Sequence, residues 1–152
     1  MKKDIKESVL EFLKENETAV ISTASPEGEP RAATVYYIVD DDFNIYFATG
    51  RETDKFKNLQ YNKRAAFVVG TGPAVITVQG GGRVEELDGD SLKEKGEIGG
   101  KLYFKALKEW PVLKLPHAGI SFFKIIPDRI KFLNLDSVGH SETYKEGYYQ
   151  IL

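Results

Sequence analysis

The pattern of hydrophobic and polar positions divides the chain into an N-terminal helix and a series of strands. Over residues 4–15, apolar side chains recur at helical spacing and form one stripe of Ile5, Val9, Phe12 and Leu13. Asp4 is suited to cap this helix. Segments rich in β-branched and aromatic residues predict strands at 18–24, 31–39, 43–49, 64–71, 74–87, 119–126 and 129–135. Further helices are predicted at 53–62, with Phe56, Leu59 and Tyr61 facing inward, and at 89–109.

The order of these elements favours one fold class. The strands are clustered and joined mainly by tight turns, and no alternation of strand, helix and strand is visible. The pattern therefore predicts an α+β fold with a six- to seven-stranded antiparallel β-barrel and peripheral helices. We expect a single domain over residues 1–152.

Several positions interrupt the elements. Gly80-Gly81-Gly82 lies inside a strand, where glycines mark a bulge, a corner or the close approach of another backbone or a flat ligand, and a barrel corner is the default. Gly99-Gly100 is expected to break or bend the third helix, and Trp110-Pro111 to end it. Pro127-Asp128 is expected to join two strands. The segment after residue 135 is either a final strand or an arm.

Composition excludes several classes of protein. The formal net charge of −2 argues against a protein dedicated to nucleic acid, such as a barrel that stacks single-stranded bases. The absence of cysteine excludes disulfides, thiol catalysis and thiolate metal sites. The N-terminal residues do not have the pattern of a signal peptide, and no apolar run is long enough for a membrane span. We therefore expect a cytoplasmic protein.

The junction between the strand at 43–49 and the following helix is the strongest candidate site. Thr49, Thr53 and Lys55 place hydroxyls and a cation where the first N–H groups of a helix lack partners, which suits an anion such as a phosphate. Arg31 begins one strand of the predicted hairpin and Thr49 ends the other, so the two would be neighbours. The alternative is that Arg31 and Lys55 are solvated surface charges. The acidic residues at 52 and 54 suit a helix start but would repel a phosphate unless they point away.

Groups for catalysis or metal binding are sparse. His117 and His140 belong to no recognisable triad or metal spacing, so each is interpreted as a loop histidine. Asp40-Asp41-Asp42 is interpreted as a solvated hairpin tip and not as a metal site. A bound cofactor would therefore have to supply any redox chemistry.

Several segments together resemble one family. Their order and spacing are similar to those of the pyridoxamine 5′-phosphate oxidase-like FMN-binding split barrels, in particular the general stress protein branch; the segments are 28–37, 45–49, 55–59, 62–66 and 76–84. The resemblance implies a homodimer with FMN in a groove between the subunits, bound by strand residues Ala33, Thr34, Val35 and Tyr36. It also implies that Ala48 and Thr49 lie beside the flavin. Lys55 would bind the phosphate with help from the Thr53 hydroxyl, and residues near Gln79 would approach the ring from the other subunit. Arg31 is a further candidate for the phosphate from the hairpin argument above.

The sequence differs from the true oxidases at three places. Asp54 stands where many members have a basic residue, Val75 stands where the oxidases have glutamine, and the C-terminal segment lacks their basic, histidine-containing motif. The resemblance thus implies a flavin-dependent oxidoreductase whose substrate is not pyridoxamine phosphate. The alternative is a non-enzymatic binding module on the same barrel, with a degenerate site or with another flat cofactor such as haem or a deazaflavin.

Overall fold

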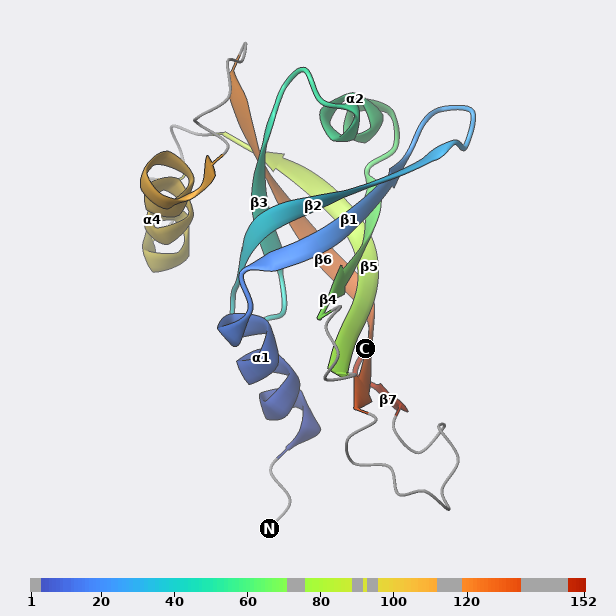
Figure 1. The fold of residues 1–152 in the computed structure, drawn as a ribbon, viewed down its shortest axis with the longest axis vertical. Coiled ribbons are helices and arrows are strands. Elements are labelled where there is room, and N and C mark those ends of the chain that lie inside the picture. The colour runs from blue at the N-terminus through green and yellow to red at the C-terminus, as the bar shows by residue number, and fades with distance from the viewer. Residues whose placement is uncertain (1–3, 71–75, 89–91, 93–95, 112–118, 135–147) are drawn as a thin grey trace.

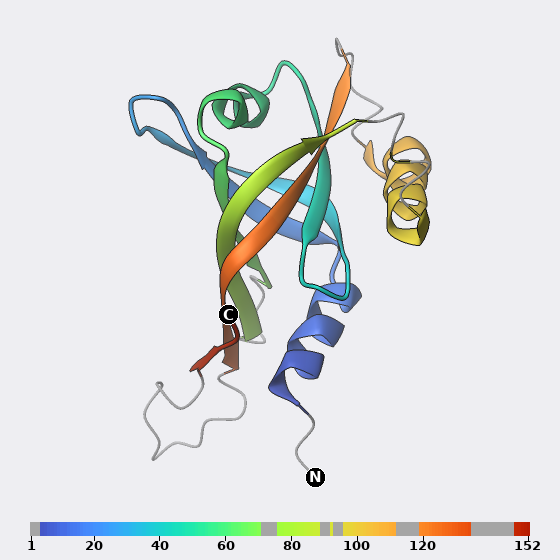
Figure 2. The same cartoon turned by 180° about the vertical axis from the view of Figure 1, so that it is seen from behind.

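The computed structural model describes residues 4–70, 76–88, 92, 96–111, 119–134 and 148–152. The described elements in chain order are α1 (Ile5–Glu15), β1 (Thr18–Ala24), β2 (Pro30–Val39), β3 (Ile45–Gly50), α2 (Asp54–Tyr61), β4 (Arg64–Val69), β5 (Ile76–Leu87), α4 (Gly96–Phe104), η1 (Lys105–Glu109), β6 (Ile120–Asn134) and β7 (Tyr148–Gln150). The strands form one antiparallel sheet in the order β3-β2-β1-β4-β5-β6-β7. An additional pairing of β3 with β6 closes the first six strands into a barrel (Figures 1 and 2). This confirms the predicted fold class.

The long β5–β6 pair contains the main departure from prediction. β6 is a single strand of 15 residues, so the prediction of two strands joined at Pro127-Asp128 was wrong. The register shifts between Gly81 and Gly82, where Gly81 pairs with Arg129 and Gly82 with Pro127. Asp128 is therefore the extra residue of a bulge. Because the hydrogen-bond ladder is already interrupted at a bulge, the neighbouring Pro127 disturbs it little.

The three glycines of β5 lie against the protein's own atoms. A Cβ added at Gly80 would collide with the Phe67 ring, and one at Gly82 would collide with the carbonyl oxygen of Ile126. One at Gly81 would lie 2.9 Å from the Arg129 guanidinium. The corner interpretation therefore explains all three glycines, and a flat ligand is not needed to account for them.

The barrel interior holds the larger hydrophobic core. Phe47, Phe67 and Phe123 are fully buried there, and the Phe47 and Phe123 rings stack with centroids 5.5 Å apart. Helices α1 and α2 lie toward opposite ends of the barrel (Figures 1 and 2). The Tyr37 hydroxyl donates a 2.6 Å hydrogen bond to the carbonyl oxygen of Leu13 and so fixes the last turn of α1, and burial raises the pKa of Tyr37.

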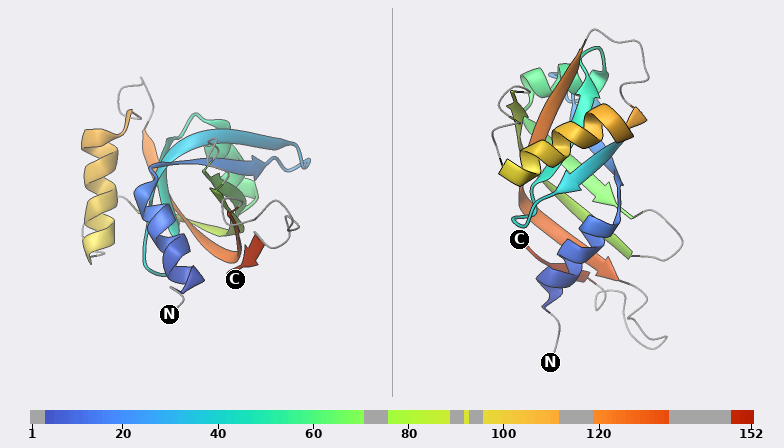
Figure 3. Two further views of the ribbon diagram at one scale, coloured as in Figure 1. Left: turned by 60° about the horizontal axis from the view of Figure 1, so that its bottom comes forward. Right: turned by 90° about the vertical axis from the view of Figure 1, so that its left-hand side faces the viewer.

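A second core lies outside the barrel wall, beneath α4 and η1 (Figure 3). Its buried members come from β2, β3, β5, β6, α4 and η1, with Leu92 before α4 and Trp110 after η1. They are Ile38, Tyr46, Ala48, Leu87, Leu92, Leu102, Ala106, Trp110 and Phe122. Helix α4 continues through Gly99 and Gly100, so the expected break there was wrong. The irregularity occurs instead in the π-helical turn η1, which ends before Trp110 as predicted.

Other details of the prediction have mixed outcomes. Tyr61 is 74% exposed and does not face inward. β3 begins only at Ile45, because the Asp40 carboxylate accepts hydrogen bonds from the Asp42 and Asn44 N–H groups and extends the hairpin turn. Of the side chains that the structure describes, no three group as metal ligands, and none of the described helices is long and apolar enough to cross a membrane. His117 and His140 lie outside the described residues, and the final residues form the short strand β7.

Candidate functional site

The start of α2 brings two hydroxyl groups together. Thr53 caps the helix, because its Oγ1 accepts a 3.2 Å hydrogen bond from the Phe56 N–H and donates to the Gly50 carbonyl oxygen at 2.9 Å. The Thr49 hydroxyl, buried at the end of β3, lies 3.0 Å from the Thr53 hydroxyl. Since Thr53 already donates to Gly50, Thr49 is the donor of this pair. The predicted neighbours Thr49 and Thr53 are therefore in contact.

Lys55 supplies a cation in the first turn of the same helix. Its side chain is half-buried, and burial lowers its pKa, an effect that the nearby Asp54 charge opposes. Among the described residues no carboxylate lies within 4.0 Å of its ammonium group. A cation that is partly removed from water and lacks a counter-ion is disposed to bind an anion.

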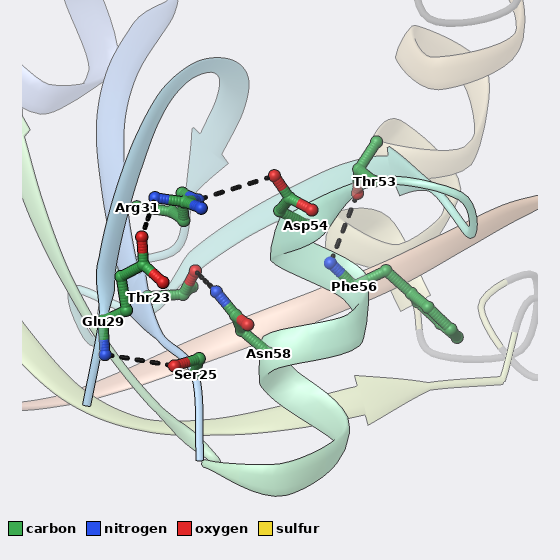
Figure 4. A network of polar contacts seen from close by, with 8 residues as sticks. All are labelled: Thr23, Ser25, Glu29, Arg31, Thr53, Asp54, Phe56 and Asn58. Atoms are coloured by element: carbon green, nitrogen blue, oxygen red, sulfur yellow. Dashed lines mark hydrogen bonds and ion pairs between the residues drawn. The ribbon is translucent and has the colours of Figure 1, made fainter. Parts of the chain in front are cut away.

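Arg31 is placed differently from Lys55. Its guanidinium lies between two carboxylates, with Nη1 2.8 Å from Glu29 Oε1 and Nε 3.7 Å from Asp54 Oδ2 (Figure 4). All three side chains are more than half exposed. Arg31 therefore does reach the start of α2, through Asp54.

The predicted hairpin pairing of Arg31 with Thr49 is not found. β2 and β3 pair only over residues 37–39 and 45–47, and Arg31 pairs with Thr23 of β1 instead. The end of β3, including Thr49, pairs with β6. The barrel closure thus pairs the end of β3 with β6, while the start of β2 pairs with β1.

A buried hydrogen bond fixes α2 against the barrel. The Asn58 side-chain amide donates to Thr23 Oγ1 at 3.1 Å (Figure 4), and both side chains are buried. Leu59, on the same helix, is also fully buried in the barrel core. These contacts hold the first turn of α2, and so Lys55, at a defined position relative to β1 and β2.

The remaining predicted residues of β2 and β3 face different environments. Val35 and Ala48 are buried in the inner and outer cores, so their side chains are not open to a ligand. Ala33 is partly exposed and Thr34 is exposed on the outer face of the barrel. Tyr36 is 37% exposed, and its ring stacks on Trp110 with centroids 6.1 Å apart.

Gln79 lies on the exposed face of β5, three strands from β2. The register runs from Gln79 to Val68, from Val68 to Val20, and from Val20 to Thr34. At roughly 4.8 Å between neighbouring strands, the path along the curved sheet from Gln79 to Thr34 of one chain is about 14 Å. Within one protomer, Gln79 therefore lies on a different part of the barrel wall from Thr34.

Two charged residues near the site were not predicted. Glu29 precedes Arg31 by two positions, and this spacing places both side chains on one face of an extended segment. The sequence therefore contained a signal for this ion pair. Arg51 follows β3 directly, and its Nε donates to Ser121 Oγ at 3.0 Å. Arg51 also lines a hollow of about 350 Å³ with Glu86 and Asp88. No local feature of the sequence predicts the contact between Arg51 and Ser121 of β6.

Comparison with known proteins identifies the family of this chain. The family model described as pyridoxamine 5′-phosphate oxidase matches residues 5–134. The chain therefore belongs to the pyridoxamine 5′-phosphate oxidase family. Comparison with curated protein sequences gives no significant match.

Three solved structures are similar to this chain in fold. A heme binding protein from Mycobacterium smegmatis has a TM-score of 0.73 and 15% identity, over 99% of this chain and 59% of that one. General Stress Protein 26 from Bacillus anthracis has a TM-score of 0.65 and 19% identity, over 98% and 100% of the two chains. A pyridoxamine 5′-phosphate oxidase-related, FMN binding protein from Nostoc punctiforme has a TM-score of 0.60 and 13% identity, over 99% and 98%.

Proposed function

We propose that this protein binds FMN at the β3–α2 junction and acts as a flavin-dependent oxidoreductase. The observation that supports this most directly is Lys55, a half-buried cation without a carboxylate partner among the described residues, in the first turn of the helix that Thr53 caps. Membership of a family with an FMN-binding relative makes the phosphate of FMN the anion of choice.

The residues at the junction fit the phosphate group in most respects. Lys55 would donate to the phosphate, and the N-terminal end of α2 would add partial positive charge, while the Phe56 N–H stays bonded to the Thr53 hydroxyl. The exposed edge and face of β2 around Thr34 would lie along the ring. When bound, the flavin supplies hydride or electron transfer, while the barrel orients it and limits its contact with water.

We further propose that two copies of the chain form the complete site. Gln79 is exposed but lies about 14 Å along the curved sheet from Thr34 of its own chain, at three strand spacings. A second copy that packs on the outer face of β1, β2, β4 and β5 would bring its Gln79 over the ligand. Sedimentation equilibrium tests this proposal, and a monomer at micromolar concentration would contradict it. A cytoplasmic location remains a prediction from the sequence.

The experiment that tests FMN binding is a fluorescence titration of the purified protein with FMN. Lys55→Ala should weaken binding at least tenfold, because loss of one charge-assisted contact costs about 1.5–3 kcal/mol. Lys57→Ala is the matched control, since it removes the same charge from an exposed position of the same helix. Equal losses in the two variants, or no FMN binding by the unchanged protein, would refute the assignment.

A second candidate is a binding module for another flat cofactor, such as haem or a deazaflavin. The carboxylates of Glu29 and Asp54 against Arg31 favour it, because they reduce the positive charge available to a phosphate. The heme binding protein from Mycobacterium smegmatis has the same fold. The absorbance spectrum after addition of FMN or haemin distinguishes the candidates, because the two ligands absorb in different bands.

A further inference from the structure

The charges at the proposed phosphate site cancel. Arg31 and Lys55 are the cations of the site, and Glu29 and Asp54 are its acids. The two cations are not equivalent, because Arg31 lies against both carboxylates whereas Lys55 has no carboxylate partner among the described residues. A ligand phosphate would meet one available cation and one that is already engaged.

Asp54 is the acid that stands between the two cations. It belongs to the first turn of α2 and directly precedes Lys55, and its Oδ2 lies 3.7 Å from Arg31 Nε (Figure 4). A phosphate monoester carries a charge of about −1.5 to −2 near pH 7 and binds a guanidinium through the same N–H groups as a carboxylate does. Asp54 and the phosphate therefore compete for Arg31.

We propose that Asp54 is an affinity-determining residue that competes with the ligand phosphate for Arg31 and so weakens the binding of the flavin nucleotide. This inference rests on the proposed function. Its consequence is selective: Asp54 weakens the binding of flavins that carry a phosphate more than the binding of phosphate-free flavins.

The test compares Asp54→Asn with the unchanged protein in the binding of FMN and riboflavin. The ion pair is exposed, so its removal should tighten FMN binding by about two- to fivefold at low salt. The gain should appear mainly as slower FMN dissociation, followed by stopped-flow fluorescence, and should shrink as salt is added. Riboflavin binding should change by less than the FMN effect.

Glu52→Gln is the matched control. Glu52 is an exposed carboxylate two residues before Asp54, in the turn that leads into α2, and makes no ion pair with Arg31. A general field effect would change FMN binding equally in Asp54→Asn and Glu52→Gln, and that result would overturn the proposal. Asp54→Glu keeps the charge and should bind FMN as the unchanged protein does.

A double-mutant cycle isolates the competition itself. Arg31→Ala should weaken FMN binding less in the unchanged protein than in the Asp54→Asn background, where the guanidinium is released. Equal losses in both backgrounds, or weaker FMN binding by Asp54→Asn, would overturn the proposal. If FMN binds but Asp54→Asn leaves it unchanged, only this inference fails. If neither form binds FMN while circular dichroism shows both folded, the proposed function fails with it.

Discussion

Replacement of Asn58 by alanine tests how α2 is held in place. The Asn58 amide donates to Thr23 Oγ1 at 3.1 Å, with the two residues only 7% and 3% exposed. Loss of one partner leaves the other buried without its hydrogen bond, which costs about 1–3 kcal/mol. For a chain of this length, that loss lowers the melting temperature by about 2–12 °C.

The same replacement should weaken ligand binding, because Lys55 lies one turn before Asn58 on α2. Thermal melting by circular dichroism and FMN titration are the two measurements. Gln60→Ala is the control, since Gln60 is exposed on the same helix and its 3.4 Å contact with Glu86 is at the surface. A melting temperature that falls no further in Asn58→Ala than in Gln60→Ala would refute the reasoning.

A double-mutant cycle with Thr23→Val separates the hydrogen bond from the lost side-chain volume. Valine keeps the shape of Thr23 and removes its hydroxyl. If the hydrogen bond is the main term, the free energies of unfolding lost in Asn58→Ala and Thr23→Val will not add in the double variant. Simple additivity would mean that packing alone holds the helix.

Three further predictions concern the barrel, α1 and the cation. Gly82→Ala should lower the free energy of unfolding, measured by urea denaturation, by about 3 kcal/mol or more, because the added Cβ would collide with a β6 carbonyl oxygen. Gly100→Ala, in open space on α4, should raise the free energy of unfolding by about 0.5–1 kcal/mol. Tyr37→Phe should cost about 1–3 kcal/mol, because it leaves the buried Leu13 carbonyl group without its donor, and an unchanged denaturation midpoint would contradict this. Burial lowers the Lys55 pKa below its ordinary 10.5. In the pH window just below 10.5 the unfolded chain therefore binds more protons at this lysine than the folded protein does, so the stability of the unliganded protein should rise with pH there. FMN affinity should fall in the same window, because the ammonium group loses its proton. Lys55→Arg, which stays charged, should remove that fall in affinity.

Much of the fold could be predicted because its signals are local. The first strand was predicted with its observed bounds, Thr18–Ala24, since a turn-forming segment follows it directly. Asp4 was predicted to cap α1, and its carboxylate does accept a hydrogen bond from the Lys6 N–H. Each of these features depends on residues within a few positions of one another, so the sequence alone determines them.

Features that depend on a distant partner were missed. Pro127 and Asp128 are typical turn residues, and only the pairing of Gly81 and Gly82 across the sheet shows that they form a bulge. Gly100 suggested a break in α4, but the helix continues through it, with open space beside the glycine. At Pro127 and Asp128 the pairing across the sheet overrides the local preference for a turn.

The candidate site divides along the same line. Thr53 and Lys55 follow from the local start of a helix, and the structure places the Thr53 hydroxyl at the helix cap as that signal requires. The contact of Arg31 with Asp54 could not be predicted, because β2 pairs with β3 over only three residues and the remainder of β3 pairs with β6. The length of that hairpin is a property of the closed barrel.

The two cations of the site should therefore have unequal roles. Lys55 is half-buried with no carboxylate within 4.0 Å in the described parts of the chain, so a bound anion would offset a desolvation cost that the free protein already bears. Arg31 is exposed and paired, so an anion must exchange one partner for another and gains little. Loss of Lys55 should consequently weaken FMN binding at least tenfold, whereas loss of Arg31 should change it little until Asp54 is neutralised. This inequality arises because burial, and not the number of charges, sets the contribution of each cation.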